Sequence, residues 1–542
     1  MSVIKSLHAL ETVILLLLIL VAVFAVLAHK LKVPYPIVLV LAGLAISFVP
    51  HMPRIPLEPS LVFLIFLPPL LYSSAWSTSW REFKRNLGVI GLLAFGLVGF
   101  TVWGVAEFSD RFITALDWKA GFLLGAVVST TDAIAATSIA KSVGLPRRIV
   151  DILEGESLMN DATGLLALEI GLSIIVRGQT PTVAEDLTRL LYLVMGGIGI
   201  GLVIGVVVSW IEKFIDDGPV ELVVSVVVPY AAYLAGEEIR ASGVLAVVAC
   251  GLYMSRQSAT FFSPSVRIQV FAGWKALTFV LNGMVFMMIG LQLPYVMAAI
   301  HGKYGLATLL EYGAIFSVVL IVLRMVWVYP AAKIASLVRW KKRPEEKALN
   351  ARETFVIGWT GMRGVLALAA AISVPETLEN GQPFGPRNLI VFLAFCVILV
   401  TLVLQGLSLP SLIRMLGLAG EKGMEPEERN ARKVALKEAL EFLRKKRIER
   451  GEEFSHAYDD LIDRYEHRLE DIDDDERVGQ REGSKKETYR LMLALGEEAV
   501  QTERRTIIRL RNEGLISDDV LRTIESEMDL EETRFQANEM SM

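Results

Sequence analysis

Long apolar runs dominate the first 420 residues of this 542-residue chain. Many of them reach about 20 residues, the length that an α-helix needs to cross a hydrocarbon core roughly 30 Å thick. Hydrophobic residues make up 53% of the chain and its mean hydropathy is +0.49, whereas soluble domains are typically about 45 to 50% apolar. Strands of a membrane barrel would alternate in polarity over about 10 residues, and such segments are not seen. We therefore expect an all-α polytopic membrane protein.

The hydropathy pattern predicts about thirteen transmembrane helices before residue 420. Their expected ranges are 12–28, 35–50, 58–75, 87–106, 119–140, 148–176, 188–213, 219–237, 242–254, 271–292, 306–337, 353–375 and 388–416. From about residue 421 the composition changes to Glu, Lys, Arg and Asp with helical periodicity. We therefore expect two domains, a transmembrane domain over residues 1–420 and a cytoplasmic helical tail over residues 421–542.

Basic residues are distributed unevenly between alternate loops. The richer loops contain Lys30 and Lys32, Arg81, Lys84 and Arg85, Lys141, Arg147 and Arg148, Arg256 and Arg267, and the basic block within 339–352. By the positive-inside rule these loops face the cytoplasm. With an odd number of spans, the N-terminus lies outside and the tail inside. This topology predicts a multi-pass protein of the inner (plasma) membrane of the cell.

Two predicted spans carry a carboxylate where a helix should cross lipid. Asp161 lies in the apolar stretch 155–164, and Asp132 lies among hydroxyl residues in the stretch 129–137. A charge at the centre of a bilayer costs about 2.5 to 3.5 kcal/mol on insertion scales, so such carboxylates are rare unless they line an ion or proton pathway. Only a short basic loop separates the two helices, so both acids can share one cavity. The alternative is a structural hydrogen-bond network.

Oxygen-bearing side chains surround both acids. Ser157 is one helical turn before Asp161 and on the same face, and Thr131 precedes Asp132. Hard cations prefer carboxylate, hydroxyl and carbonyl oxygens. A carboxylate must also carry any transported proton, because all six histidines lie near span ends, in loops or in the tail. We therefore expect Asp161 and Asp132 to hold a transported Na⁺ or a proton in turn, with no catalytic residue, no cofactor and no nucleic-acid partner.

Other polar residues in the predicted spans favour structural roles. Glu156 and Arg324 are both expected in lipid, so we interpret them as an ion pair. The segment 358–365 holds three glycines around Arg363, which indicates a broken helix with Arg363 compensating its carbonyl ends. Transporters place two such helices at the membrane midplane, in corresponding positions of inverted repeats. Residues 130–132 would be the counterpart. A plain glycine-rich packing face is the alternative.

Several motifs together resemble the signatures of NhaP/NHE-type sodium/proton antiporters. They are Gly155-Glu156-Ser157-Leu158-Met159-Asn160-Asp161, Thr131-Asp132, Gly361-Met362-Arg363-Gly364, Phe66-Leu67-Pro68-Pro69-Leu70-Leu71 and Leu404-Gln405-Gly406-Leu407. The resemblance implies a thirteen-helix fold with two inverted six-helix repeats, a homodimer, and an elevator-like movement of an ion-carrying core. It also implies electroneutral exchange of one cation for one proton, because an Asn-Asp pair rather than Asp-Asp is present.

The resemblance also implies roles for individual residues. Asp161 and Asp132 are then ion and proton ligands, Ser157 and Thr131 assist them, and Asn160 orients Asp132. The pair Glu156 and Arg324 is structural. Two departures stand out: Ser73 occupies a position where many prokaryotic relatives have a Glu, and Ala133 follows Asp132 where many have a proline.

These observations predict a secondary antiporter that exchanges cytoplasmic Na⁺, or a related monovalent cation, for H⁺ and serves pH homeostasis. A K⁺/H⁺ antiporter of the same fold stays open, because side-chain identity does not distinguish Na⁺, Li⁺ and K⁺. An intramembrane aspartyl protease using Asp132 and Asp161 is a second alternative, although no Gly-X-Gly-Asp string is present. A cation channel would need a repeated carbonyl filter or a ring of acids. Partners of the tail are unknown.

Overall fold

The computed structural model describes residues 2–49, 59, 62–177, 183–261, 263–300, 302, 304–340, 349–378, 381–420, 426–450, 455–474, 484–513, 515, 521, 524–525, 527–530 and 532–533. Within these residues the chain is helical apart from turns, connecting segments and an isolated β-bridge between Thr377 and Pro383. The expectation of an all-α protein is confirmed. The chain forms two compact units, Met1–Glu421 and Lys422–Met542.

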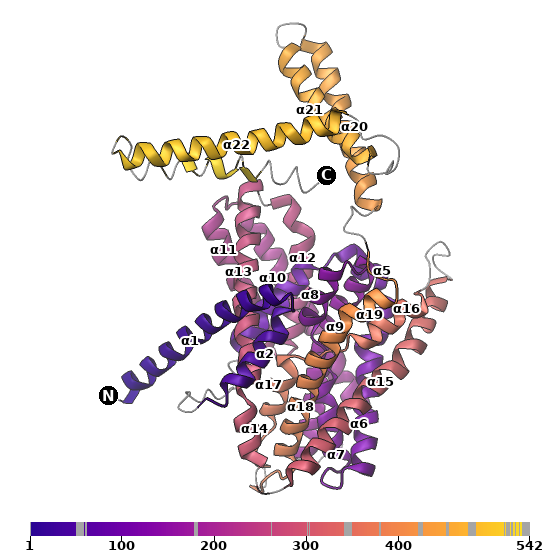
Figure 1. The fold of residues 1–542 in the computed structure, drawn as a ribbon. Helices are drawn as coiled ribbons and strands as arrows, with labels where there is room; N and C mark the ends of the chain where they lie inside the picture. Colours follow the sequence, from indigo (N-terminus) through magenta and orange to yellow (C-terminus); the bar gives the residue numbers. More distant parts are fainter. Residues whose placement is uncertain are drawn as a thin grey trace. The chain divides into compact units, whose positions relative to one another are not determined.

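The first unit contains the apolar helices (Figure 1). Its N-terminal elements are α1 (Ser2–Leu31), α2 (Tyr35–Ile46), η1 (Val62–Phe66), α4 (Leu67–Ser77), α5 (Trp80–Gly91), η2 (Leu92–Leu97) and α6 (Val98–Phe112). The central elements are α7 (Trp118–Ser129), α8 (Ala133–Val143), α9 (Arg147–Arg177), α10 (Val183–Glu212), α11 (Gly218–Glu238), α12 (Gly243–Phe261) and α13 (Pro264–Leu291). The last elements are α14 (Leu293–Ile300), α15 (Leu306–Trp340), α16 (Ala351–Trp359), α17 (Val365–Ser373), α18 (Arg387–Val400), η3 (Thr401–Gln405) and α19 (Gly406–Met415).

Nine helical spans in the described part of the chain are long and apolar enough to cross a membrane, and one of them, Trp118–Ala140, includes a short non-helical segment. Two shorter apolar helical stretches, Tyr35–Ile46 and Val62–Ser77, accompany them. Helices also occupy the predicted ranges 242–254 and 353–375, as α12 and as the pair of α16 and α17, but these are not among the nine. The polytopic helical character is therefore confirmed, and the number thirteen stays a prediction.

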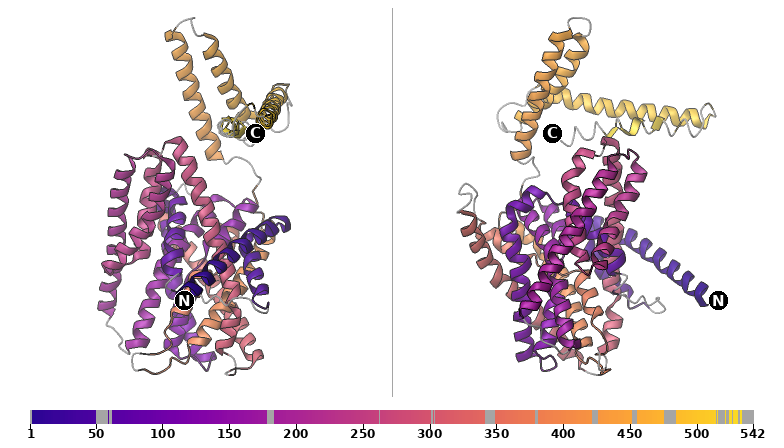
Figure 2. Two further views of the ribbon diagram at one scale, coloured as in Figure 1. Left: turned by 90° about the vertical axis from the view of Figure 1, so that its left-hand side faces the viewer. Right: turned by 180° about the vertical axis from the view of Figure 1, so that it is seen from behind.

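The helices of the first unit fall into two packed groups. Helices α10, α11, α12 and α13 pack together at one side, and α6, α7, α15 and α18 pack at the other (Figure 1; Figure 2). The buried apolar side chains form two clusters that do not coincide with these groups, because α13 contributes Trp274 to one cluster and Phe286 to the other. Helix α9 contributes Leu153 to one cluster and Leu158 to the other. The long helix α9 therefore contacts both clusters.

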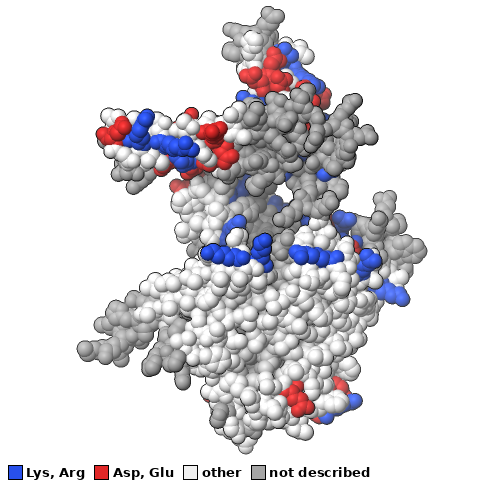
Figure 3. All heavy atoms as spheres, in the orientation of Figure 1, with Lys and Arg blue, Asp and Glu red and all other residues white. Residues whose placement is uncertain are grey.

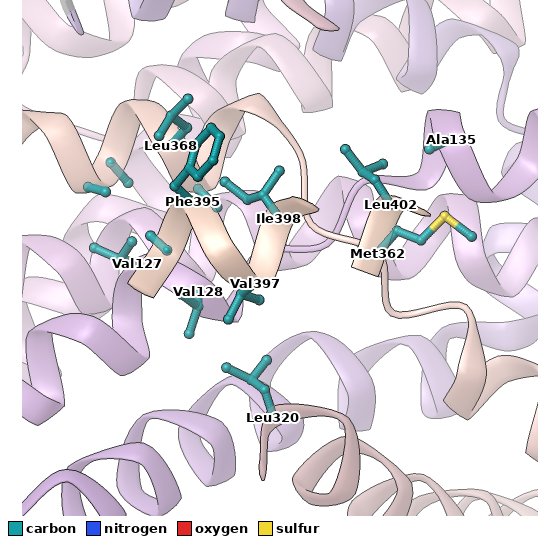
Figure 4. Close-up of a cluster of buried hydrophobic side chains, with 14 of the residues drawn as sticks. Val127, Val128, Ala135, Leu320, Met362, Leu368, Phe395, Val397, Ile398 and Leu402 are labelled. Carbon is teal, nitrogen blue, oxygen red and sulfur yellow. The ribbon is translucent and has the colours of Figure 1, made fainter. Parts of the chain in front are cut away.

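Tight apolar packing surrounds the short helices α7 and α17. Val128 of α7, Leu368 of α17 and Ile398 of α18 are all fully buried within one cluster (Figure 4). In lipid such contacts act mainly through van der Waals packing, because the surrounding acyl chains are as apolar as the side chains. The packing holds the ends of these short helices in a fixed geometry.

The surface of the first unit fits a lipid environment. On the face drawn in Figure 3, the described Lys and Arg residues form a band at one end of the helices, and charged groups return only at the opposite end. Large apolar side chains of the first unit are exposed, among them Met195 at 65% and Trp210 at 62%. Apolar exposure on this scale is unusual for a surface in water.

The second unit is polar and helical. It contains α20 (Pro426–Arg450), α21 (Ser455–Asp474) and α22 (Ser484–Asn512). Helices α20 and α21 pack side by side and are joined by ion pairs, including Arg444 with Glu466 at 2.6 Å. Exposed pairs of this kind contribute less than about 1 kcal/mol each. The cytoplasmic location of this unit stays a prediction.

Candidate functional site

Two helices of the first unit are interrupted, and their interruptions touch. Residues 130–132 separate α7 from α8, and residues 360–364 separate α16 from α17. The backbone N–H of Asp132 donates a hydrogen bond of 2.8 Å to the carbonyl oxygen of Met362. Both breaks occur where the sequence predicts them. Each break exposes backbone groups that a continuous helix would use internally.

Gly364 allows the two interruptions to approach each other. A Cβ atom on Gly364 would lie only 2.7 Å from the Cβ of Asp132. Carbon atoms of side chains do not adopt such a separation, so any larger residue here would push the acid away. Glycine is required by this close approach of backbone to side chain rather than by an unusual φ angle.

Arg363 donates hydrogen bonds at the carbonyl ends of both interrupted helices. Its Nε donates a hydrogen bond of 2.8 Å to the carbonyl oxygen of Val128, near the end of α7. A terminal nitrogen donates to the carbonyl oxygen of Gly361, just beyond α16. Helix C-termini carry partial negative charge. The contacts of this buried guanidinium agree with the predicted compensation of these ends, which stays a prediction.

Asp132 caps the second half of its interrupted helix. Its Oδ1 accepts a hydrogen bond of 2.8 Å from the N–H of Ile134 in the first turn of α8. The partial positive charge at a helix N-terminus favours an anion there, typically by about 0.3 to 1 kcal/mol at exposed sites. The half-buried side chain therefore has a defined orientation at the break.

Ser157 of α9 fastens the first interruption in place. Its hydroxyl donates a hydrogen bond of 2.6 Å to the carbonyl oxygen of Thr131. The same Oγ accepts a hydrogen bond of 3.1 Å from the N–H of Ala133. Proline at position 133 would lack that N–H. Alanine thus supplies a hydrogen bond to α9, and the chain unwinds here without the proline that many relatives carry.

Asn160 contacts Thr131 in the structure. Its Nδ2 donates a hydrogen bond of 2.6 Å to Thr131 Oγ1, and its Oδ1 accepts from the Thr131 N–H at 3.4 Å. The family resemblance implied that Asn160 orients Asp132. In the described contacts, any effect on Asp132 passes through the backbone of its neighbour Thr131.

Asp161 and Asp132 line the same cavity. Its volume is about 70 Å³, and a water molecule needs only about 10 to 15 Å³ of such volume. The cavity can therefore hold a few waters or a partly hydrated ion. The polar residues on its wall are Ser74, Thr130, Thr131, Asp132, Ser157, Asp161 and Asn282.

Two of these polar residues were not expected from the sequence. Ser74 comes from α4 and Asn282 from α13. Asn282 is a single amide in the almost entirely apolar stretch 276–291, and that isolation is the signal that could have identified it. No comparable signal marks Ser74, because hydroxyl residues surround it on α4.

Glu156 and Arg324 form a bidentate ion pair beside the site. The two terminal guanidinium nitrogens of Arg324 lie 2.5 and 2.8 Å from the two Glu156 oxygens. Arg324 also donates to the carbonyl oxygens of Gly358 and Ile357, at 3.1 and 3.0 Å. Glu156 and Arg324 are each 1% exposed. The pair connects α9 and α15 to the end of α16. Both carboxylate oxygens of Glu156 are occupied by Arg324.

The cavity offers few charges to a cation. No group of three His, Cys, Asp or Glu side chains suited to a metal ion occurs among the described residues. A cation between Asp161 and Asp132 would therefore meet two carboxylates and otherwise neutral oxygens. This donor set suits a monovalent hard cation that is released again.

A family model described as sodium/hydrogen exchanger, transmembrane, matches residues 15–415. The match includes α9 and both interrupted helices. The chain belongs to the sodium/hydrogen exchanger family. The exchanger is thus a multi-pass membrane transporter rather than an enzyme, and the alternative of an intramembrane protease is not favoured.

The exchanger is similar to known bacterial proteins. An uncharacterized Na⁺/H⁺ exchanger, Rv2287 of Mycobacterium tuberculosis, is 32% identical over 530 residues, which are 96% of this chain and 95% of that protein. A sodium, potassium, lithium and rubidium/H⁺ antiporter of Bacillus pumilus is 31% identical over 451 residues, 81% of this chain and 66% of that protein.

The fold of the exchanger is similar to that of a solved antiporter. The structure of MjNhaP1 from Methanocaldococcus jannaschii superposes with a TM-score of 0.57 at 21% sequence identity, covering 77% of this chain and all of that chain. This similarity concerns the fold alone. The family match and the sequence relatives identify the exchanger as a monovalent cation:proton antiporter of the NhaP type.

Proposed function

We propose that the exchanger moves cytoplasmic Na⁺, or a related monovalent cation, against H⁺, with Asp161 and Asp132 binding both ions in turn. One observation carries the proposal: the two acids, from α9 and from the break before α8, line one cavity at the contact between two interrupted helices. Ser157 and Thr131 supply neutral oxygens at the same wall.

Competition at one site couples the two ions. A carboxylate that binds a proton loses the charge that attracts a cation, and a bound cation disfavours protonation. Because few other charges face the cavity, loading with one ion requires release of the other. Coupling then needs no second binding site.

We further propose that the exchange is electroneutral, one cation for one proton. Glu156 is already matched by Arg324, and Asn160 next to Asp161 is a neutral amide. Replacing one bound H⁺ by one Na⁺ then leaves the net charge of the site unchanged. Exchange of this stoichiometry serves pH homeostasis independently of the membrane potential.

Alternating access is proposed to follow an elevator mechanism. The body carrying the site would contain α9 and the interrupted helices, and it would move against the group of α10 to α13. Support comes from the presence of two clusters of buried apolar side chains, to which the long helices α9 and α13 both contribute. We propose that the second body also forms a homodimer with another copy of the chain.

The proposed topology has thirteen spans in two inverted repeats, with the interrupted helices as counterparts that cross at the membrane midplane. The N-terminus would lie outside and the tail of residues 421–542 in the cytoplasm of a bacterial cell with the protein in its inner membrane. The uneven distribution of Lys and Arg between alternate loops supports this orientation.

Sodium is our first choice of cation, because the Mycobacterium tuberculosis relative is named for Na⁺. The name of the Bacillus pumilus relative adds potassium, lithium and rubidium. A K⁺/H⁺ antiporter of the same fold is therefore the alternative within the proposal.

The test is dissipation of a pH gradient in proteoliposomes on addition of Na⁺, Li⁺ or K⁺, with and without a potential clamp. We expect a cation-specific response that is insensitive to the clamp. Asp161→Asn should abolish it, because an amide of similar volume can neither hold a proton nor balance a cation. Asp110→Asn, at an exposed position near the end of α6, is the control. Exchange by Asp161→Asn at the wild-type rate would refute the assignment.

A further inference from the structure

Asn282 reaches the ion cavity from a helix that carries none of the acids. It lies in the middle of α13, and its side chain lines the cavity together with Asp161 and Asp132. Only 7% of the residue is exposed. Helix α13 packs mainly against α2 and α11, whereas α9 packs against α5, α7 and α8. The amide therefore forms part of a different wall from the one that holds the acids.

The Asn282 amide has no protein partner among the described residues. Burying an amide without a hydrogen bond is unfavourable, and buried polar groups in folded proteins almost always have a partner. The next polar side chain on the same helix, Thr278, bonds to the carbonyl oxygen of Trp274 in its own helix. The Asn282 amide instead lines a cavity with room for a few waters or a partly hydrated ion.

We infer that Asn282 is a cation-selecting ligand of the exchanger, whose side-chain oxygen contacts the monovalent cation, or a water in its shell, opposite Asp161 and Asp132. The inference rests on the proposed function. An amide oxygen suits this position chemically, since it binds a hard cation without adding charge. A third carboxylate would instead add a negative charge to the site.

Removing the amide oxygen should weaken binding of the cation and leave proton binding at the acids in place. Asn282→Leu keeps the number and branching of the side-chain heavy atoms and replaces both polar atoms by methyl groups. We expect the apparent KM for Na⁺ to rise about tenfold with the maximal rate nearly unchanged, the pattern for loss of a binding contact. The preference among Na⁺, Li⁺ and K⁺ should change as well.

The experiment compares wild type, Asn282→Leu, Asn282→Ala, Asp161→Asn and the matched control Thr278→Val in proteoliposomes. A second readout is the shift in unfolding temperature that Na⁺ causes in detergent, which measures binding without transport. We expect this shift in wild type and Thr278→Val, and its loss or reduction in the other three. Asn282→Ala, which removes the side chain beyond Cβ, tests the inference independently of the fit of the larger leucine.

The outcomes separate the two proposals. If both Asn282 variants keep the wild-type KM, ion preference and Na⁺ shift while Asp161→Asn loses activity, the inference is overturned and the proposed function stands. If wild type neither exchanges nor responds to any of the three cations, the proposed function fails and the inference fails with it. A selective rise in KM with retained maximal rate supports the inference.

Discussion

The hydroxyl of Ser157 donates a hydrogen bond of 2.6 Å to the carbonyl oxygen of Thr131. This contact joins an intact helix, α9, to the break between α7 and α8. A backbone carbonyl that has left its own helix needs such a partner, because lipid offers none. The contact also fixes Asp132, at the break, relative to Asp161 of α9, the two acids that we propose as ion ligands.

Ser157→Ala should reduce both stability and exchange. The substitution leaves the Thr131 carbonyl and the Ala133 N–H without their partner, a loss typically worth about 1 to 3 kcal/mol. Thermal unfolding in detergent and Na⁺-driven exchange would measure the two effects. Ser173→Ala is a matched control on the same helix, since the Ser173 hydroxyl donates to the carbonyl oxygen of Ile170 in α9 itself. Equal behaviour of the two variants would contradict the role of Ser157.

Breaking the pair of Glu156 and Arg324 on one side only should be strongly destabilising. Removal of one partner from a buried ion pair typically costs about 3 to 5 kcal/mol, because the other charge stays buried alone. Glu156→Gln or Arg324→Gln alone should therefore lower the unfolding temperature more per substitution than the double variant. A double-mutant cycle in detergent measures this coupling. Additive losses would mean that the two groups do not interact.

The apparent affinity for Na⁺ should fall as the pH falls. Protons then occupy the carboxylates that the cation needs, and competition of one proton with one cation changes the apparent affinity by up to about tenfold per pH unit. The measurement is the apparent KM for Na⁺ in proteoliposomes between about pH 6 and pH 8, where buried acids commonly titrate. An affinity that stays constant over this window would exclude competition at one site.

Neutralising Glu212 and Glu221 together should stabilise the protein. Both residues are buried, at 1% and 0% exposure, and none of their four carboxylate oxygens has a hydrogen-bond partner in the described structure. An uncompensated buried carboxylate is unfavourable, so an amide of the same shape should cost less. We expect Glu212→Gln with Glu221→Gln to raise the unfolding temperature in detergent at about pH 8, the charged regime of a free carboxylate. A fall in that temperature would indicate that the charges have a partner outside this chain.

The sequence alone was sufficient for the helical membrane character and for the central acids. Apolar runs long enough to span lipid favour α-helices, because lipid offers no hydrogen-bond partners and a helix pairs its backbone N–H and C=O groups within one segment. Asp132 and Asp161 were recognisable because a carboxylate in such a run is costly. The glycines around Arg363 likewise predicted the second break.

Tertiary structure alone decided which distant groups share the cavity. Helical periodicity relates residues three or four apart, so it could place Ser157 beside Asp161. It could not bring Asn282 or Ser74 to the same wall, because α13 and α4 reach the acids only through packing. The partner of Asn160 was decided in the same way. Asn160 bonds to Thr131, because the position of α9 along the axis of the interrupted helix places Asn160 beside that residue. The spacing of side chains along one helix does not determine the axial position of that helix relative to another.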